Sequence, residues 1–150
     1  MSGLPENPTV LVTGATDGLG RALAERLAVE GATVLMHGRD RDRLAAAEAE
    51  VETLAGADRV RTYRADLSAL DQVRDLADQI RRDEQELHVV VNNAGIGFGK
   101  PEGGERQESL DGHELRFAVN YLAGFLLTLE LVPLLVESAP SRVVNVASLG

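Results

Sequence analysis

The sequence has no cysteine and no tryptophan, and aromatic residues make up only 3% of its 150 residues. A chain without cysteine forms no disulfide, no thiolate metal site and no cysteine nucleophile. This composition suits a reducing compartment, so we expect a cytoplasmic protein. The histidines, His37, His88 and His113, are scattered and have no acidic partners at metal-ligand spacing, so we expect no metal site. Because aromatics are rare, the core has to consist of Val, Leu, Ile and Ala.

Basic residues are outnumbered, with 15 Lys and Arg against 24 Asp and Glu and a formal net charge of -9. Proteins that bind nucleic acid present net basic surfaces to it, so we expect no nucleic-acid partner. The longest apolar run, residues 121–136, is interrupted by Thr128, Glu130 and Pro133 and falls short of the ~20 residues of a membrane span. Residues 1–8 do not have the pattern of a signal peptide. We therefore expect a soluble protein with no membrane span.

What the sequence does have is a regular alternation of apolar strands and helices, with 44% hydrophobic residues to form a core. Strands are predicted at residues 9–13, 33–36, 60–63, 88–91 and 142–146. Helices are predicted at residues 21–30, 40–54, 68–82 and 115–136, the third capped by Ser68 and the last bent or ended near Pro133. Continuous apolar strands are typical of a parallel sheet covered on both faces. The sequence therefore predicts one α/β domain over residues 1–150, a Rossmann-type doubly wound parallel sheet.

Three glycines, Gly14, Gly18 and Gly20, separate the first predicted strand from the first helix. Glycine permits a sharp turn and lets a pyrophosphate approach the backbone, and the following helix directs its free N–H groups and positive dipole end at the anion. The spacing is Gly-x-x-x-Gly-x-Gly, which differs from the common Gly-x-Gly-x-x-Gly motif. A purely structural turn is the alternative. The position of the loop at the first connection of a repeated strand–helix pattern favours the dinucleotide site.

Several motifs occur in the order found in the short-chain dehydrogenase/reductase family, which the chain resembles from Thr9 onward. These are Thr13-Gly14-Ala15-Thr16-Asp17-Gly18-Leu19-Gly20, Asp66, Asn92-Asn93-Ala94-Gly95, Asn120 and Ser148. Residues 111–135 are also similar to the retinol-dehydrogenase-like members. Each motif alone is weakly specific, whereas their joint occurrence in this order is highly specific.

The resemblance implies a role for each motif. Thr13 would brace the glycine loop against the fourth strand, and Asn92 would stabilise the sheet. Asn120 would hold a water of a proton relay, while Ser148 would bind the substrate carbonyl or hydroxyl. The implied cofactor residues are Thr13, Gly14, Thr16, Asp17, Gly18, Leu19 and Gly20 in the glycine loop, Asp66 and Leu67 beside the adenine, and Asn93, Ala94 and Gly95 beside the ribose. Taken singly, Asp66 would be a strand-end turn residue, Asn120 a buried polar group satisfied locally and Ser148 a turn hydroxyl.

The end of the second strand bears on the choice of nicotinamide cofactor. An acid there binds the ribose 2′-hydroxyl of NAD, whereas a nearby arginine accommodates the 2′-phosphate of NADP. This sequence has Gly38 at that position, followed directly by Arg39. A guanidinium group suits phosphate because it is permanently charged and donates in a planar fork, so we expect NADP(H) to be favoured over NAD(H).

Three observations keep the cofactor question open. Arg39 alone is also consistent with a solvated residue at the start of a helix. Asp40 can pair with Arg39 or meet the ribose itself. Asp17 stands where some NADP-dependent members of the family carry a basic residue.

The family's Tyr-x-x-x-Lys pair is missing from these residues. Tyr63 and Tyr121 are followed four positions later by Leu67 and Phe125, and the only lysine is Lys100. The resemblance therefore indicates the N-terminal part of an oxidoreductase that transfers hydride between NADP(H) and an alcohol or carbonyl substrate. It stops just after the catalytic-type serine and before the later strands, so we expect this chain alone to be inactive. A catalytically inactive nucleotide-binding or scaffold protein of the same fold is the alternative.

Two apolar surfaces, one on a helix and one along a strand edge, are expected to be left uncovered by residues 1–150. Residues 117–136 carry apolar side chains on more than one helix face, and we expect the outer face to form a homo-oligomer in the complete protein. Burial under further parts of the same chain is the alternative. The strand over residues 142–146 lacks its outer neighbour. This would leave Val143, Val144 and Val146 along an unpaired edge and make residues 1–150 alone prone to aggregation.

Overall fold

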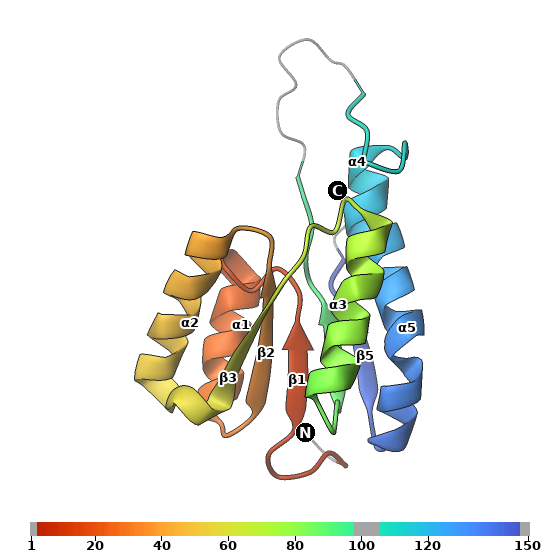
Figure 1. Cartoon of the computed structure of the whole chain (residues 1–150). Coiled ribbons are helices and arrows are strands. Elements are labelled where there is room, and N and C mark those ends of the chain that lie inside the picture. The colour runs from red at the N-terminus through yellow and green to blue at the C-terminus, as the bar shows by residue number, and fades with distance from the viewer. Residues whose placement is uncertain (1–2, 98–105, 148–150) are drawn as a thin grey trace.

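The computed structural model describes residues 3–97 and 106–147. Five parallel strands form one sheet in the order β3-β2-β1-β4-β5, so the first strand of the chain is the central one (Figure 1). The strands are β1 (Thr9–Val12), β2 (Thr33–Gly38), β3 (Val60–Arg64), β4 (Val89–Asn92) and β5 (Arg142–Asn145). The predicted doubly wound α/β architecture is confirmed.

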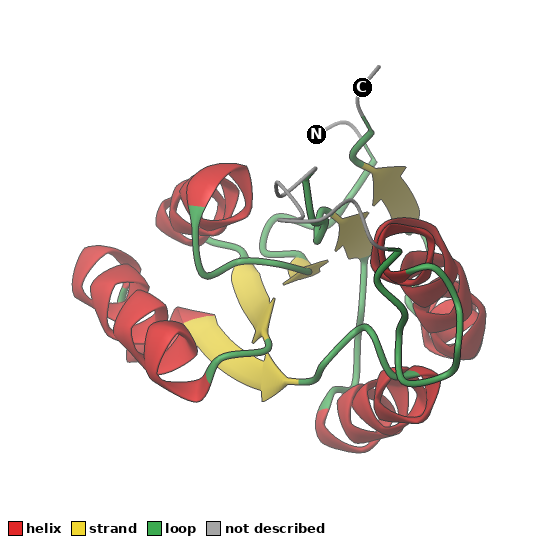
Figure 2. Cartoon of the chain, turned by 90° about the horizontal axis from the view of Figure 1, so that it is seen from above, coloured by secondary structure: helices red, strands yellow, loops and turns green. Residues whose placement is uncertain are grey.

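Helices cover both faces of the sheet (Figure 2). On one face lie α1 (Gly18–Val29) and α2 (Arg41–Ala55), and on the other α3 (Leu70–Asp83) and α5 (Ala123–Glu137). A helical turn, α4 (Leu115–Phe117), and a π-helical segment, η2 (Ala118–Leu122), run without a break into α5. A short 3-10 turn, η1 (Ala57–Arg59), precedes β3.

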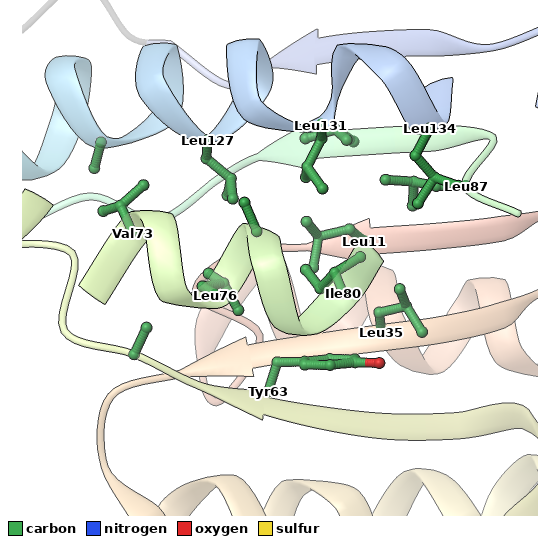
Figure 3. Close-up of a cluster of buried hydrophobic side chains, with 14 of the residues drawn as sticks. Leu11, Leu35, Tyr63, Val73, Leu76, Ile80, Leu87, Leu127, Leu131 and Leu134 are labelled. Carbon is green, nitrogen blue, oxygen red and sulfur yellow. The ribbon is translucent and has the colours of Figure 1, made fainter. Parts of the chain in front are cut away.

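The core has two halves because side chains alternate between the faces of a strand. Leu11, Leu35 and Val90 join the half that is covered by α3 and α5, where Leu127 and Leu131 of α5 point toward α3 (Figure 3). Their strand neighbours join the half that is covered by α1 and α2: Val10, Val12, Val34, Met36, Val89 and Val91. Both faces of these strands are therefore buried, which is why the sequence shows uninterrupted apolar runs.

Two helix starts differ from the predictions because the groups that cap them were not recognised. α1 begins at Gly18, where Asp17 Oδ1 accepts a hydrogen bond from Gly18 N at 2.7 Å. α3 begins at Leu70, and Ser68 does not cap it. Leu70 N instead donates to Asp111 Oδ2 at 2.8 Å. This cap is a tertiary contact, so the local pattern could not show it.

The long helix also differs from its prediction. Pro133 lies inside α5, and the helix continues to Glu137. The whole segment Leu115–Glu137 has 23 residues, and an 18-residue stretch within it has a mean hydropathy of 1.8. It therefore has the length and composition of a membrane-crossing helix, and the argument that the apolar run is too short was wrong. Leu127, Leu131 and Leu134 of this helix are buried in the core, but only 28% of its apolar stretch is buried, whereas the core helix of a soluble protein is mostly buried.

β5 lies at an edge of the sheet, and among the described strands only β4 pairs with it. Val143, Val144 and Val146 are 41%, 44% and 43% exposed. The prediction of an unpaired apolar edge at this strand is confirmed.

Candidate functional site

A cleft of about 530 Å³ opens beyond the carboxyl ends of β1, β2 and β4. Open parallel sheets bind ligands at this edge, where the strand order reverses, and here the reversal lies between β1 and β4. All the residues predicted to bind the cofactor line this cleft except Thr13. They are Gly14, Thr16, Asp17, Gly18, Leu19, Gly20, Arg39, Asp66, Leu67, Asn93, Ala94 and Gly95.

The glycine loop fits so closely against its surroundings that two of its glycines leave no room for a side chain. A Cβ on Gly20 would lie 2.2 Å from Gly14 O and 2.4 Å from Asn93 Nδ2. A Cβ on Gly14 would lie 2.9 Å from Ala94 Cα, and Gly14 has a φ of +65°. Beyond this loop, the amides of Leu19 and Gly20 lie in the first turn of α1, where no preceding carbonyl pairs with them. The loop therefore forms a cradle of backbone groups that suits a pyrophosphate.

Thr13 lies behind the cleft and fastens the loop to the end of β4. Its Oγ1 accepts hydrogen bonds from Asn93 N and Ala94 N, both at 3.0 Å, and donates to Val91 O at 3.3 Å. Asn93 returns the contact, since its Nδ2 donates to Thr13 O at 3.0 Å and to Gly14 O at 3.3 Å. The bracing expected of Thr13 is thus present in the hydrogen bonds, and Asn93 takes part in it.

His37 is a residue of the site that the sequence analysis missed. It is buried at the end of β2, where its Nδ1 accepts from Gly14 N at 3.3 Å and its Nε2 donates to Ala65 O at 3.1 Å. Burial lowers the pKa of His37 to about 4, so the ring is neutral and can keep both bonds. The sequence did contain a signal for His37. It is a polar residue at the end of an otherwise apolar strand, β2, and this strand end lies beside the glycine loop that follows β1.

The end of β2 has no space for an acidic side chain. A Cβ on Gly38 would lie 2.5 Å from Thr16 Cγ2 and 3.3 Å from Leu44 Cδ1. Arg39 follows and lines the cleft, and its guanidinium makes no hydrogen bond or ion pair with any residue of the described ranges. The wall that would meet the 2′-position of a bound adenosine ribose therefore offers a cation and no carboxylate at position 38.

Asp40 and Arg43 have roles that the sequence left open or did not show. Asp40 Oδ1 caps α2 by accepting from Arg43 N at 2.9 Å, and this hydrogen bond lowers the pKa of the Asp40 carboxyl. Its carboxylate thus caps the helix, a role that the sequence analysis did not consider, and no ion pair joins it to Arg39 within the described residues. Arg43 lines the same cleft and forms an ion pair with Asp17, with Nη2 and Oδ2 2.8 Å apart.

Asp66 and Leu67 form the wall beyond β3. Asp66 Oδ1 accepts from Ser68 N at 2.9 Å, and Asp66 N donates to Gln72 Oε1 at 2.9 Å. Leu67 is only 6% exposed and belongs to the core cluster under α3 and α5. These contacts fix the turn between β3 and α3. Asp66 is therefore a turn residue, as the alternative in the sequence analysis had it, and it also lines the cleft.

Asn120 lies in the π-helical segment, and both ends of its amide are in use. Its Oδ1 accepts from Ile96 N at 2.8 Å and its Nδ2 donates to Ile96 O at 3.0 Å. Asn120 is exposed, so it is not the buried polar group that the sequence analysis gave as the alternative, and its partner Ile96 lines the cleft. Asn92 joins three elements as expected, because its Nδ2 donates to Thr128 Oγ1 at 3.0 Å and to Asn145 Oδ1 at 2.9 Å.

Little proton-transfer chemistry is present in the part of the chain that the structure describes. Ser148 and Lys100 lie outside the described residues. Tyr63 is buried away from the cleft and donates to Glu84 Oε1 at 2.6 Å, and burial raises its pKa. Within residues 3–97 and 106–147, no group of three or more His, Asp or Glu side chains is placed to hold a metal. The arrangement can bind a dinucleotide and orient it.

The geometry agrees with what comparisons with known proteins find. The family described as short chain dehydrogenase matches residues 8–150. Retinol dehydrogenase 11 from Homo sapiens is 39% identical over 141 residues, which cover 94% of this chain and 43% of that protein. The chain thus spans less than half the length of this relative.

Two solved structures are similar over nearly the whole chain. A short-chain dehydrogenase from Sphingobium yanoikuyae in complex with NADPH gives a TM-score of 0.79 at 29% identity, covering 95% of this chain and 54% of that one. A metagenomic short-chain oxidoreductase in complex with NADP gives a TM-score of 0.80 at 30% identity, covering 98% and 64%. The strand order, the cradle at the switch point and the matched residues 8–150 lead to one conclusion: the chain belongs to the short-chain dehydrogenase family and is retinol-dehydrogenase-like.

Proposed function

We propose that the protein containing this chain is an NADP(H)-dependent oxidoreductase that interconverts an alcohol and a carbonyl compound. The observation that carries the cofactor preference is the end of β2. Thr16 occupies the space that a side chain at position 38 would need, and Arg39 and Arg43 line the adjoining part of the cleft. The two solved relatives described above are complexes with NADPH and NADP, which supports the same preference.

In this proposal, different residues of the cleft contact different parts of the dinucleotide. The amides of Leu19 and Gly20 hold the pyrophosphate at the start of α1, where the helix dipole favours an anion. Asp66 and Leu67 border the adenine. Asn93, Ala94 and Gly95 border the nicotinamide ribose, on the side of the cleft formed by β4.

The chemistry needs more than this chain supplies. The nicotinamide provides or accepts the hydride when it is bound. Asn120 and Ser148 are proposed to orient a water and the substrate oxygen. Residues 1–150 contain no Tyr-x-x-x-Lys pair to exchange the proton, so we expect them to have no dehydrogenase activity on their own.

We also propose that the complete protein is a cytoplasmic homo-oligomer. Phe117, Tyr121 and Phe125 form a stacked row on the outer face of the long helix, with ring centroids 5.3 and 6.2 Å apart. They are 50%, 56% and 55% exposed, and Leu129 and Val136 extend the row. A continuous exposed apolar face is typical of a contact with another chain or with a membrane, and we propose the first.

Cofactor titration of the full-length gene product tests the preference. NADPH should bind more tightly than NADH by fluorescence titration, and Arg39→Ala should remove most of the difference. One charge-assisted hydrogen bond is worth ~1.5–3 kcal/mol, or roughly ten- to a hundred-fold in affinity. Arg26→Ala, on the exposed surface of α1, is the matched control and should leave both affinities unchanged. Equal affinities of the unsubstituted protein for NADPH and NADH would contradict the proposal, and a gene without the Tyr-x-x-x-Lys pair would favour an inactive nucleotide-binding protein.

A further inference from the structure

Asp17 makes two contacts with its two carboxylate oxygens. Oδ1 accepts from Gly18 N at 2.7 Å and caps α1, while Oδ2 binds Arg43 Nη2 at 2.8 Å. The second contact joins the glycine loop to the first turn of α2, across one wall of the cleft. Both side chains are largely exposed, Asp17 at 79% and Arg43 at 59%.

An ion pair this exposed holds Arg43 only weakly. Water screens the attraction and two side chains lose freedom, so such a pair changes an equilibrium constant by on the order of fivefold at most. A phosphate monoester carries more charge than a carboxylate and accepts several hydrogen bonds, so it binds a guanidinium more strongly. Arg43 therefore has a partner in the present structure that a phosphate ligand can replace.

Asp17 at the same time places a negative charge beside a site for anions. Arg39 and Arg43 line the cleft on the side where Gly38 has no side chain. With a ligand that has only a 2′-hydroxyl, Arg43 can stay on Asp17. With a 2′-phosphate, an Arg43–phosphate contact would replace the Arg43–Asp17 contact, and the carboxylate would compete with the ligand for the same guanidinium.

We propose that Asp17 and Arg43 form an exchange pair that sets the strength of the preference for a 2′-phosphorylated adenosine. Arg43 is a specificity-determining residue alongside Arg39, and Asp17 limits the affinity that the two arginines would otherwise give. This rests on the proposed function, because it assumes that the cleft binds a nicotinamide dinucleotide.

Binding of adenosine fragments tests the exchange pair without any turnover. Adenosine 2′,5′-bisphosphate and 5′-AMP differ only in the 2′-phosphate, and the ratio of their affinities is measured by calorimetry on the full-length protein. Arg43→Ala should lower this ratio about tenfold, in line with the loss of one charge-assisted contact. Asp17→Asn keeps an N-cap acceptor and removes the charge, so it should raise the ratio roughly two- to fivefold.

The double variant Asp17→Asn/Arg43→Ala shows whether Asp17 acts by binding Arg43 or only by its negative charge near the ligand. In the Arg43→Ala background, Asp17→Asn should change the ratio less than about twofold at 0.15 M salt, because a through-space effect is screened there. Glu30→Gln, which breaks an exposed ion pair elsewhere on α1, is the control for losing an acid. Thermal melts of all variants check folding.

The possible results distinguish a failure of the proposed NADP preference from a failure of the exchange pair alone. A ratio near one in the unsubstituted protein overturns the proposed NADP preference. If Arg39→Ala abolishes a high ratio but Arg43→Ala leaves it unchanged, only the exchange pair is wrong. A lower ratio in Asp17→Asn would show that Asp17 positions Arg43 for the phosphate instead of competing with it, which also overturns the exchange.

Discussion

At the scale of single residues, Gly20 is the position where one added carbon should do most harm. Its Cβ would collide with the backbone oxygen of Gly14 and the amide of Asn93, which together hold the loop to β4. We expect Gly20→Ala to cost about 1–3 kcal/mol of stability by overpacking and to weaken NADPH binding more than tenfold. Urea denaturation and fluorescence titration measure the two effects.

Gly97→Ala is the matched control for Gly20→Ala. A Cβ there would meet no atom of residues 3–97 and 106–147 within 4 Å, so stability and cofactor affinity should stay close to those of the parent. Equal effects of the two substitutions would contradict the close fit of the glycine loop.

His37 should make the stability of the protein depend on pH in a defined window. The pKa of His37 is about 4 in the folded protein and 6.5 in the unfolded chain. Between pH 4 and 6.5 the unfolded chain therefore binds more protons than the folded protein. Stability should therefore fall as the pH is lowered from 6.5 to 4, by about 3 kcal/mol in total from this residue, and should not change through His37 above 6.5.

Urea denaturation at several pH values measures this dependence. His37→Gln should be less stable at neutral pH, since it disturbs the bonds to Gly14 N and Ala65 O, but it should flatten the slope between pH 4 and 6.5. His113→Asn removes an exposed histidine and should keep the parent slope. An unchanged slope in His37→Gln would rule out this account.

At the scale of elements, the cap of α3 comes from a residue distant in the sequence. Asp111→Ala should cost about 1 kcal/mol by removing the acceptor for Leu70 N, whereas Asp111→Asn should keep most of it. Ser68→Ala should change stability by less than about 0.5 kcal/mol, because the Ser68 side chain does not cap the helix. Chemical denaturation compares the three variants, and a larger loss in Ser68→Ala would restore the original prediction.

The elements also show how far the sequence could be interpreted. The strands were located to within two residues, most clearly β1, β2 and β4, which are apolar runs buried on both faces, whereas β3 alternates and β5 is exposed. The glycine loop was recognised by its place at the first strand–helix connection. The Asp111 cap, the π-helical segment and the contacts of His37 and Arg43 were not predicted. The cap and the two sets of contacts depend on partners that only the folded chain brings close, such as Gly14 N for His37 and Asp17 for Arg43.

At the scale of the whole molecule, the stacked row on the long helix should govern association. Phe125→Glu places a charge in the middle of this row and should shift the full-length protein toward monomers in light scattering at micromolar concentration. Leu54→Glu changes an equally exposed leucine on α2 and should leave the mass unchanged. A monomeric parent protein would refute the proposed homo-oligomer.

The exposed edge of β5 should make residues 1–150 aggregate when they are expressed alone. Its valines are exposed beside unpaired backbone groups, which are a template for pairing with other chains. Val144→Lys should raise the soluble fraction, as measured by sedimentation, because a charged edge resists pairing. A fragment that stays monomeric without the substitution would show that the edge is harmless.

The order of the strands has a consequence for synthesis on the ribosome. β1 is made first and becomes the centre of the sheet, with β2 on one side and β4 on the other. At about 5–20 residues per second, the delay between Gly38 and Val89 leaves the second edge of β1 open for roughly 3–10 s in the nascent chain. During that interval Val10, Leu11 and Val12 are exposed to any other strand nearby, so a chaperone that shields the first half of the chain would protect the yield of the whole protein.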